Sequence, residues 1–232
     1  MDENTACVLR TVLRHYPCTK LCIKQHSGLS MSTVLRAVKD LAREGWLTVD
    51  ERVVPQGGKP HAAIRPTRRP VYGAARKGDE WAVCALYLTG ETETVYAAEL
   101  PDVYPLSVVA TADEKALPLT AHVTTEAAGV AAYLAVHRQG VYVDEELRLY
   151  TPAGAALALG DLPSPLLRRK RLDYREAFKV GTPQQKIRLK AELAQYIRTI
   201  LQAEEVFFAD GVRLAPEEGA AWASMRRLLG YL

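Results

Sequence analysis

The sequence predicts a mixed α+β or α/β protein in which a small basic module precedes a larger body. Three observations support this fold class. Helical periodicity dominates the chain as far as Gly45. Strand-like and helical segments follow one another after residue 70. The basic, proline-marked stretch Arg65–Pro70 separates the two regions, and 232 residues with 48% hydrophobic content leave room for two domains.

Positive charge is concentrated in the N-terminal region. Residues 1–70 carry twelve Lys/Arg and six Asp/Glu, a net +6, whereas the remainder carries eighteen and twenty-one, a net −3. This distribution is typical of a nucleic-acid-binding module attached to a separate domain. Four cysteines without a signal peptide favour reduced thiols and a cytoplasmic location. No run approaches the roughly 18 apolar residues that a membrane span needs, so no membrane partner is expected.

The N-terminal region is predicted to contain three helices and a β-hairpin. The helices end at turn-forming residues and cover residues 4–15, 19–27 and 30–44. The strands cover residues 46–51 and 62–65, joined by a glycine- and proline-rich turn at residues 55–60. Gly28-Leu29-Ser30 forms the tight turn between the second and third helices. This order of elements predicts a winged helix-turn-helix DNA-binding domain over residues 1–67.

The third helix has the features of a DNA-recognition helix. Ser30 is a favourable N-cap, and Gly45 suits the left-handed position after the last turn. Val34, Val38 and Leu41 form an apolar face. The opposite face carries side chains that can donate hydrogen bonds to bases or phosphates. With the cap and a lysine at the wing tip, the candidate DNA-binding residues are Ser30, Ser32, Thr33, Arg36, Lys39 and Lys59.

Individual roles follow from side-chain chemistry. Arg36 is the best candidate for guanine, because its guanidinium matches O6 and N7 bidentately. Leu35 has two interpretations, packing against the first or second helix, or contact with a thymine methyl group. Lysines such as Lys20 and Lys24 either position phosphates or are simply solvated surface.

Cys18, Cys22 and His26 lie four residues apart in the sequence, so a helix would bring them to one side. That arrangement resembles part of a zinc site. A fourth ligand is not evident, and paired cysteines of the CxxC type are missing. We therefore expect the cysteines to serve as small apolar residues in the core and no metal to be bound.

The body is predicted to combine an antiparallel sheet with further strands and helices. Its strands cover residues 71–75, 81–88, 92–100, 106–111, 140–143, 147–150 and 206–209. Its helices cover residues 125–136, 182–202 and 216–229, and a basic connection spans residues 166–175. Thr182, Pro183 and Gln185 form a capping-box pattern at the start of the long helix. No internal repeat is visible in the sequence.

Along nearly its full length the chain resembles the ROK family of bacterial sugar-responsive repressors and sugar kinases. Ser27–Val34 is close to the family's TGLSKSTV, and residues 57–60 are like its glycine-basic-proline wing. Weaker matches to later motifs come in the family's order, at Val71–Gly73, Val123–Tyr133, Leu147–Gly160 and Glu205–Val212. The resemblance implies an actin-like, ribonuclease-H-like body over residues 71–232, here truncated and degenerate.

The chain departs from the family at positions that the resemblance assigns to kinase chemistry. Ala75 replaces an Asp of the first phosphate loop, and Arg76 and Lys77 replace small residues. Glu126 falls at the catalytic Asp.

Other family elements differ as well. The sugar-contacting Glu and His fall at Ala158 and Asp161, and only Gly211 remains of the adenosine-side glycines. A second phosphate loop and the zinc cysteines are not found. We therefore expect no catalytic residue, no cofactor and no bound metal.

The resulting hypothesis is a DNA-binding transcriptional regulator, a repressor, whose body serves dimerisation or sensing. Its expected partners are double-stranded DNA with a palindromic operator, a second copy of the chain and, as the resemblance implies, a small sugar effector. One alternative is a sugar-responsive repressor that retains an effector site. The other is an active sugar kinase, which would need the phosphate loops that are missing.

Overall fold

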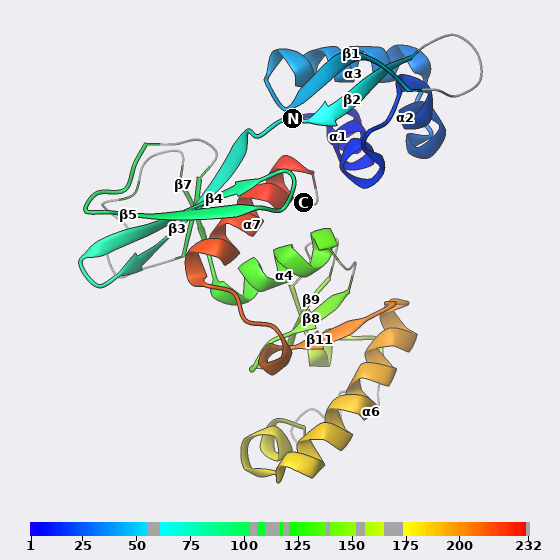
Figure 1. The fold of residues 1–232 in the computed structure, drawn as a ribbon. Helices are drawn as coiled ribbons and strands as arrows, with labels where there is room; N and C mark the ends of the chain where they lie inside the picture. Colours follow the sequence, from blue (N-terminus) through cyan, green and yellow to red (C-terminus); the bar gives the residue numbers. More distant parts are fainter. Residues whose placement is uncertain are drawn as a thin grey trace.

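The computed structural model describes residues 1–54, 61–102, 106–109, 117, 121–137, 140–151, 156–164 and 174–230. Within these residues the chain is elongated (Figure 1). The N-terminal module (residues 1–67) lies at one end, a five-stranded sheet with two helices lies in the middle, and a smaller sheet with a long helix lies at the other end. None of the described helices is long and apolar enough to cross a membrane.

The N-terminal module consists of three helices and a two-stranded antiparallel sheet. These elements are α1 (Glu3–His15), α2 (Lys20–Ser27), α3 (Met31–Arg43), β1 (Leu47–Val54) and β2 (His61–Pro66). Each helix begins after a residue whose side chain accepts a hydrogen bond from an N–H of the first turn, namely Asp2, Thr19 and Ser30. Gly28 ends α2 with φ 71°, and Gly45 follows α3 with φ 77°, so glycines occupy both left-handed positions.

The larger sheet of the body has the strand order β5-β4-β3-β6-β7. Its strands are β3 (Pro70–Lys77), β4 (Glu80–Tyr87), β5 (Thr92–Ala97), β6 (Leu106–Val109) and β7 (Ala121–Thr124). The first three form the predicted antiparallel meander, whereas β6 pairs in parallel with β3 and β7 pairs in parallel with β6. In the turn after β4, Gly90 has φ 90° and the Tyr87 N–H donates to the Glu91 carbonyl at 2.9 Å.

The smaller sheet has four strands, and its pairing directions resemble those of the larger sheet. Its strands are β8 (Val141–Val143), β9 (Arg148–Tyr150), β10 (Ala156–Ala158) and β11 (Val206–Phe208), in the order β10-β9-β8-β11. In both sheets, three consecutive antiparallel strands are followed by a later strand that pairs in parallel with the first of them. The long helix α6 (Pro183–Leu201) and a helical segment at residues 174–180 pack against the smaller sheet.

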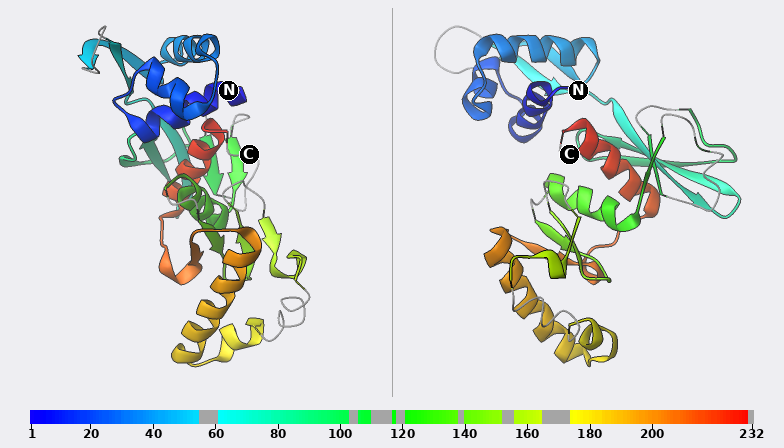
Figure 2. Two further views of the ribbon diagram at one scale, coloured as in Figure 1. Left: turned by 90° about the vertical axis from the view of Figure 1, so that its right-hand side faces the viewer. Right: turned by 180° about the vertical axis from the view of Figure 1, so that it is seen from behind.

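Helices α4 (Glu126–His137) and α7 (Pro216–Leu228) lie between the two sheets (Figure 2). Their packing depends on glycine. A Cβ atom on Gly73 of β3 would lie 1.9 Å from the backbone nitrogen of Ala221, and one on Gly129 would lie 2.6 Å from the carbonyl carbon of Gly219. The Ser224 hydroxyl, buried under the sheet, also donates to the Tyr72 carbonyl at 2.6 Å. Helix α7 is therefore held close to both β3 and α4.

A single hydrophobic cluster runs from the N-terminal module into the body. It joins the inner faces of α1 and α3 to β4 and to the C-terminal half of α7, with members that include Val8, Leu9, Val38, Leu86, Trp222, Met225 and Leu229. A second cluster lies between the smaller sheet and α6 and includes Leu149, Tyr174 and Ile197. Because burial of apolar surface stabilises by about 25 cal/mol per Å², the first cluster ties the N-terminal module energetically to the body.

Most predicted elements are present within a few residues of their expected ends. The capping box of α6 is confirmed, since Thr182 accepts from Gln185 N at 3.3 Å and Gln185 accepts from Thr182 N at 2.8 Å. Two short strands, β7 and β10, were not predicted. The sequence predicted a connection over residues 166–175, but residues 174–180 form a helical segment. The predicted turn at residues 55–60 lies outside the described residues.

Candidate DNA-binding surface and central cleft

Helix α3 begins with a network of hydroxyl groups. The Ser30 hydroxyl accepts a hydrogen bond from the Thr33 N–H at 3.2 Å. It also lies 2.9 Å from the hydroxyls of both Ser32 and Thr33. The cap therefore defines the first turn and holds three hydroxyl groups together at the end of the helix where N–H groups and the helix dipole favour phosphate.

The outer face of α3 is a stripe of exposed side chains. Val34, Ala37, Val38 and Leu41 are buried, which fixes the orientation of the helix. The residues at the outward positions are Ser32, Leu35, Arg36, Lys39 and Arg43, and all of them are exposed. The structure thus brings four of the predicted DNA-binding residues, Ser30, Ser32, Arg36 and Lys39, to the surface of one helix, with Thr33 half-buried beside them. Lys59 lies outside the described residues.

Charge on this stripe is largely available to a ligand. Among the described residues, Arg43 pairs with Asp40 at 3.0 Å, whereas no ion pair within 4.0 Å involves Arg36 or Lys39. Arg36 is near enough to Asp2, the N-cap of α1, to help lower the pKa of that carboxyl, after the larger effect of hydrogen bonds from Thr5. Hence Arg36 lies beside the start of α1 and remains exposed.

Leu35 is exposed, with 45% of its surface accessible. Packing against α1 or α2, one of the two interpretations of this residue, therefore leaves much of the side chain uncovered. An apolar side chain placed between Ser32 and Lys39 on an otherwise polar stripe fits the other interpretation, contact with an apolar group such as the thymine methyl.

Cys18, Cys22 and His26 do not converge on one point, and Cys18 lies before α2, which begins at Lys20. Cys18 is buried in the module core. Its backbone pairs with that of Ile64 in an isolated antiparallel β-bridge. Burial raises the pKa of its thiol to about 12. Burial therefore opposes the thiolate that zinc requires. Cys22 Sγ is 3.6 Å from His26 Nδ1, and the His26 ring stacks on His15 at 4.0 Å between centroids. Within the described residues no cluster of three or more His, Cys, Asp and Glu side chains is placed to hold a metal.

The stretch that connects the N-terminal module to the body is held on both sides. The Thr67 hydroxyl donates to the Gly45 carbonyl at 2.6 Å, and Arg69 lies 4.3 Å over the Trp46 ring and donates to the Glu44 carbonyl. Arg68 faces the other way and pairs with Glu91 at 3.3 Å. The connection is thus anchored to the C-terminal end of α3 and to the turn before β5.

A second contact joins α1 to the end of α7. Arg10, with 18% of its side chain exposed, donates to the Leu229 carbonyl and pairs with Glu3 at 2.7 Å. A Cβ atom on Gly230 would lie 2.9 Å from the Cβ of Ala6. A small cavity of about 180 Å³ beside these contacts is lined by both α1 and α7. The orientation of α3 relative to the body is therefore set by packing as well as by the connecting stretch.

The opposite end of α7 reaches a cleft of about 550 Å³ between the first turns of α4 and α7 and the β8–β9 hairpin of the smaller sheet. The lining comes from the start of α4, the β8–β9 hairpin and the segment before α7, and includes Glu126, Tyr142, Asp144, Arg148, Tyr150, Arg213 and Gly219. Asp144 organises the hairpin, because one carboxylate oxygen accepts from the N–H groups of Glu146 and Arg148 and the other accepts from the Tyr150 hydroxyl at 3.2 Å. Burial raises the pKa of Tyr142 to about 12, so this hydroxyl stays a hydrogen-bond donor.

The positions compared with kinase motifs lie in different places. Glu126 is the first residue of α4 and lines the cleft. Ala75 is buried in β3, whereas the exposed Arg76 lies 5.4 Å over the Trp81 ring. Ala158 N donates to Asp161 at 3.1 Å, and neither residue belongs to the lining of the cleft. Of these positions the structure brings only Glu126 to the cleft.

The tyrosines of the cleft were not predicted as site residues. Tyr142 and Tyr150 are directly paired across the β8–β9 hairpin, with ring centroids 5.9 Å apart. The sequence could have predicted that these two tyrosines lie side by side, because residues at equal distance from a hairpin turn share a face of the sheet. Nothing in the sequence showed that this face lines a cleft.

Comparison with known proteins shows a similarity at the level of fold. No protein-family model matches the sequence, and no curated protein sequence matches it. Among solved structures, the chain is similar to a crystal structure of a ROK family transcriptional regulator described as a homologue of the E. coli Mlc protein. The TM-score is 0.53 at 9% sequence identity, and the match covers 99% of this chain and 96% of that one. The chain therefore shares its fold with that regulator over nearly the full length of both.

Proposed function

We propose that the protein is a DNA-binding transcriptional regulator, acting as a repressor, whose residues 1–67 form a winged helix-turn-helix. The exposed stripe of α3 carries this proposal. An exposed helix face with Ser32, Leu35, Arg36 and Lys39, backed by a buried apolar face, has the form of a recognition helix in the major groove. The similarity of fold to a ROK family transcriptional regulator supports the same function.

The residues of α3 take different roles in this proposal. Ser30, Ser32 and Thr33 at the start of the helix contact phosphate and base edges. Arg36 contacts guanine, and Leu35 contacts a thymine methyl group. Lys39 contacts phosphate, as does Lys59 at the tip of the wing.

The body, residues 71–232, is proposed to be a ribonuclease-H-like domain of the ROK type. The shared strand scheme of the two sheets supports this, since each has three antiparallel strands followed by a parallel one. We propose that the body serves dimerisation or sensing in the cytoplasm and that the dimer binds a palindromic operator. Two half-sites give the surface that specific binding usually needs.

The test begins with selection of bound sequences from random double-stranded DNA by the full chain. Fluorescence anisotropy on the selected site then compares variants at several salt concentrations. Arg36→Ala should weaken binding by about 1–3 kcal/mol, or roughly fivefold to more than a hundredfold, and should relax one base position. Lys39→Ala should weaken binding to all sequences alike and reduce the salt slope.

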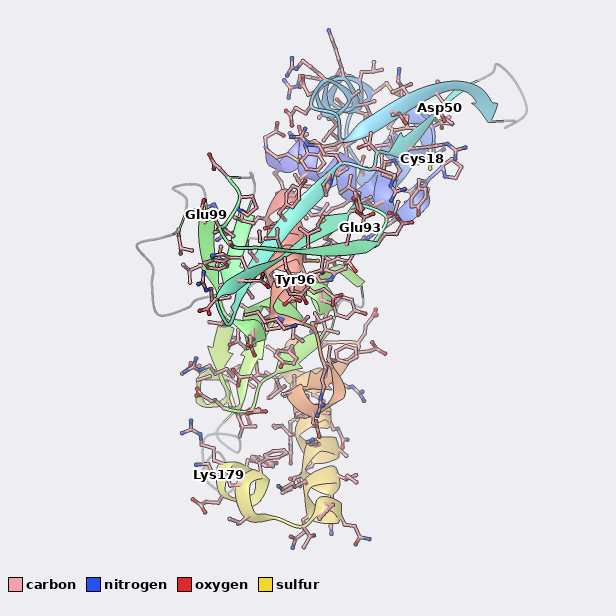
Figure 3. The ribbon with its side chains drawn as sticks, turned by 60° about the vertical axis from the view of Figure 1, so that its left-hand side comes forward. Cys18, Asp50, Glu93, Tyr96, Glu99 and Lys179 are labelled. Carbon is pink, nitrogen blue, oxygen red and sulfur yellow. The ribbon has the colours of Figure 1, made fainter. Side chains whose placement is uncertain are left out.

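Lys179 provides the matched control, because it is an exposed lysine at the end of the molecule far from α3 (Figure 3). Lys179→Ala should leave DNA affinity unchanged. The proposal fails if the wild-type chain shows no affinity for DNA at low salt, or if Arg36→Ala and Lys179→Ala have equal effects.

A second candidate function is favoured by the cleft. Its two tyrosines, Asp144 and Arg148 give an aromatic surface with polar groups around it, suited to a small polar ligand such as a sugar. Such a ligand would be an effector in the sensing hypothesis and a substrate in the kinase hypothesis. An assay for sugar-dependent ADP release separates the two, with Glu126→Gln as the control. Turnover that is lost in Glu126→Gln would establish a kinase and overturn the proposal of a regulator without catalysis.

A further inference from the structure

Strand β5 is an exposed edge of the larger sheet. It pairs with β4 on one side, and no other described strand lies on its outer side. Every residue from Thr92 to Tyr96 is exposed, and Val95 and Tyr96 have 60% and 55% of their surface accessible. Figure 3 shows Glu93 and Tyr96 along this strand. An edge with unpaired backbone N–H and C=O groups is a template for pairing with another strand.

The usual protections of an edge strand are weak here. β5 contains no proline or lysine and consists mainly of residues that favour strands, threonine, valine and tyrosine. Its one charged residue, Glu93, accepts from the Tyr87 hydroxyl at 2.9 Å and pairs with Arg68 at 3.5 Å. The carboxylate is thus neutralised within its own chain and does not repel an incoming strand.

We propose that β5 pairs with β5 of a second copy of this chain across a twofold axis near Val95. A twofold axis perpendicular to the sheet makes the two strands antiparallel and keeps α7 of both copies on the same side of the joined sheet. With Val95 opposite Val95, Tyr96 lies opposite Thr94, and Glu93 lies opposite Ala97. No two like charges are opposed within Thr92–Ala97, and aromatic and β-branched residues are paired, as in stable antiparallel sheets.

The other edge of the sheet is less suited to self-pairing. β7 has four residues against six in β5, and it is bonded to β6 in parallel. Its exposed His122 has a lowered pKa, caused by partial burial and by the positive charge of Arg227. β7 also carries an exposed valine, Val123 at 46%, which makes it a matched control.

This inference names the partner surface of the dimer in the proposed function, but it is tested without DNA. Val95→Cys and Val123→Cys are compared in the full chain under a mild oxidant, with the wild type as control for the native cysteines. Opposed residues in antiparallel strands lie within the Cα separation of about 4.4–6.8 Å that a disulfide spans. Val95→Cys should form a covalent dimer rapidly, whereas Val123→Cys and the wild type should not.

Sedimentation of non-oxidised protein gives the second measurement. Val95→Lys places two lysines opposite each other at the axis and should raise the dimer dissociation constant by about tenfold or more. Val123→Lys should leave it unchanged, and circular dichroism confirms that both variants are folded.

A wild-type chain that stays monomeric at every concentration would overturn the inference, as would cross-linking through Val123→Cys but not Val95→Cys. Either result leaves the DNA-binding proposal standing, because the anisotropy measurement on α3 variants is independent of β5. Conversely, cross-linking through Val95→Cys in a chain that binds no DNA would leave this interface established and overturn the proposed function.

Discussion

Gly73→Ala tests the contact on which the central layer depends. Gly73 lies in the middle of β3, and the Cβ of an alanine there would lie 1.9 Å from Ala221 N and 2.3 Å from the carbonyl carbon of Ala220. Both atoms belong to the backbone of α7, so no side-chain rotation can relieve the contact. Helix α7 would have to move away from the sheet, although Ser224 bonds it to Tyr72 and Ser107.

The magnitude follows from two opposing effects. Overpacking a close-packed core costs about 1–3 kcal/mol, and a clash with backbone belongs at the upper end. Replacing glycine also reduces the entropy of the unfolded chain, which offsets about 0.4–1 kcal/mol. We expect a net loss of about 2 kcal/mol, which lowers Tm by roughly 4–8 °C for a chain of this size.

Thermal unfolding followed by circular dichroism measures this loss. Gly211→Ala is the matched control, because apart from its chain neighbours no atom lies within 4 Å of its added Cβ. Only the effect on the unfolded chain remains there, so its Tm should equal that of the wild type or rise slightly, by at most about 1 kcal/mol in stability. Equal Tm values for Gly73→Ala, Gly211→Ala and the wild type would refute the close packing of β3 against α7.

Three further predictions concern the N-terminal module. Ser30→Ala removes the N-cap of α3 and should cost about 1 kcal/mol, seen as a Tm lower by roughly 2–4 °C; an unchanged Tm would contradict the cap. Arg10→Met keeps the aliphatic stem but loses the bond to the Leu229 carbonyl, so amide exchange in α1 and at the end of α7 should accelerate, whereas the exposed control Lys24→Met should not change it. Cys18 should resist iodoacetamide at a pH of about 8 while the half-buried Cys22 reacts, as mass spectrometry can show. Because burial raises the pKa of Cys18 from 9.0 to about 12, its contribution to stability is complete below pH 9.0 and is lost as the pH rises toward 12.

The N-terminal helices could be located from sequence because their ends depend on local chemistry. Ser30 and Thr19 accept hydrogen bonds from their own first turns, and Gly28 adopts the left-handed conformation that few other residues tolerate. These interactions span three or four residues, so a single sequence contains all the information that they need. The same is true of the capping box at Thr182 and Gln185.

The elements that were missed depend on distant contacts. β7 and β10 have four and three residues, too few for a periodic pattern to be recognised. The helical segment at residues 174–180 follows a basic stretch that suggested a connection. Tyr174 and Phe178 pack into the cluster beneath α6, so its helical form reflects tertiary burial rather than a local signal. The exposure of Leu35 likewise depends on which neighbours α3 has on its outer side.

The arrangement of α7 has a mechanical consequence that the sequence did not suggest. Its first turn lines the central cleft at Pro216 and Gly219, and the residue after its end accepts the hydrogen bond from Arg10 of α1. Between these points it is wedged against Gly73 and Gly129 with no room for side-chain adjustment. Packed interiors pass on displacements rather than absorbing them. A rearrangement at the cleft that shifts α7 must therefore either carry the N-terminal module with it or break the contacts of Arg10 and the cluster around Trp222.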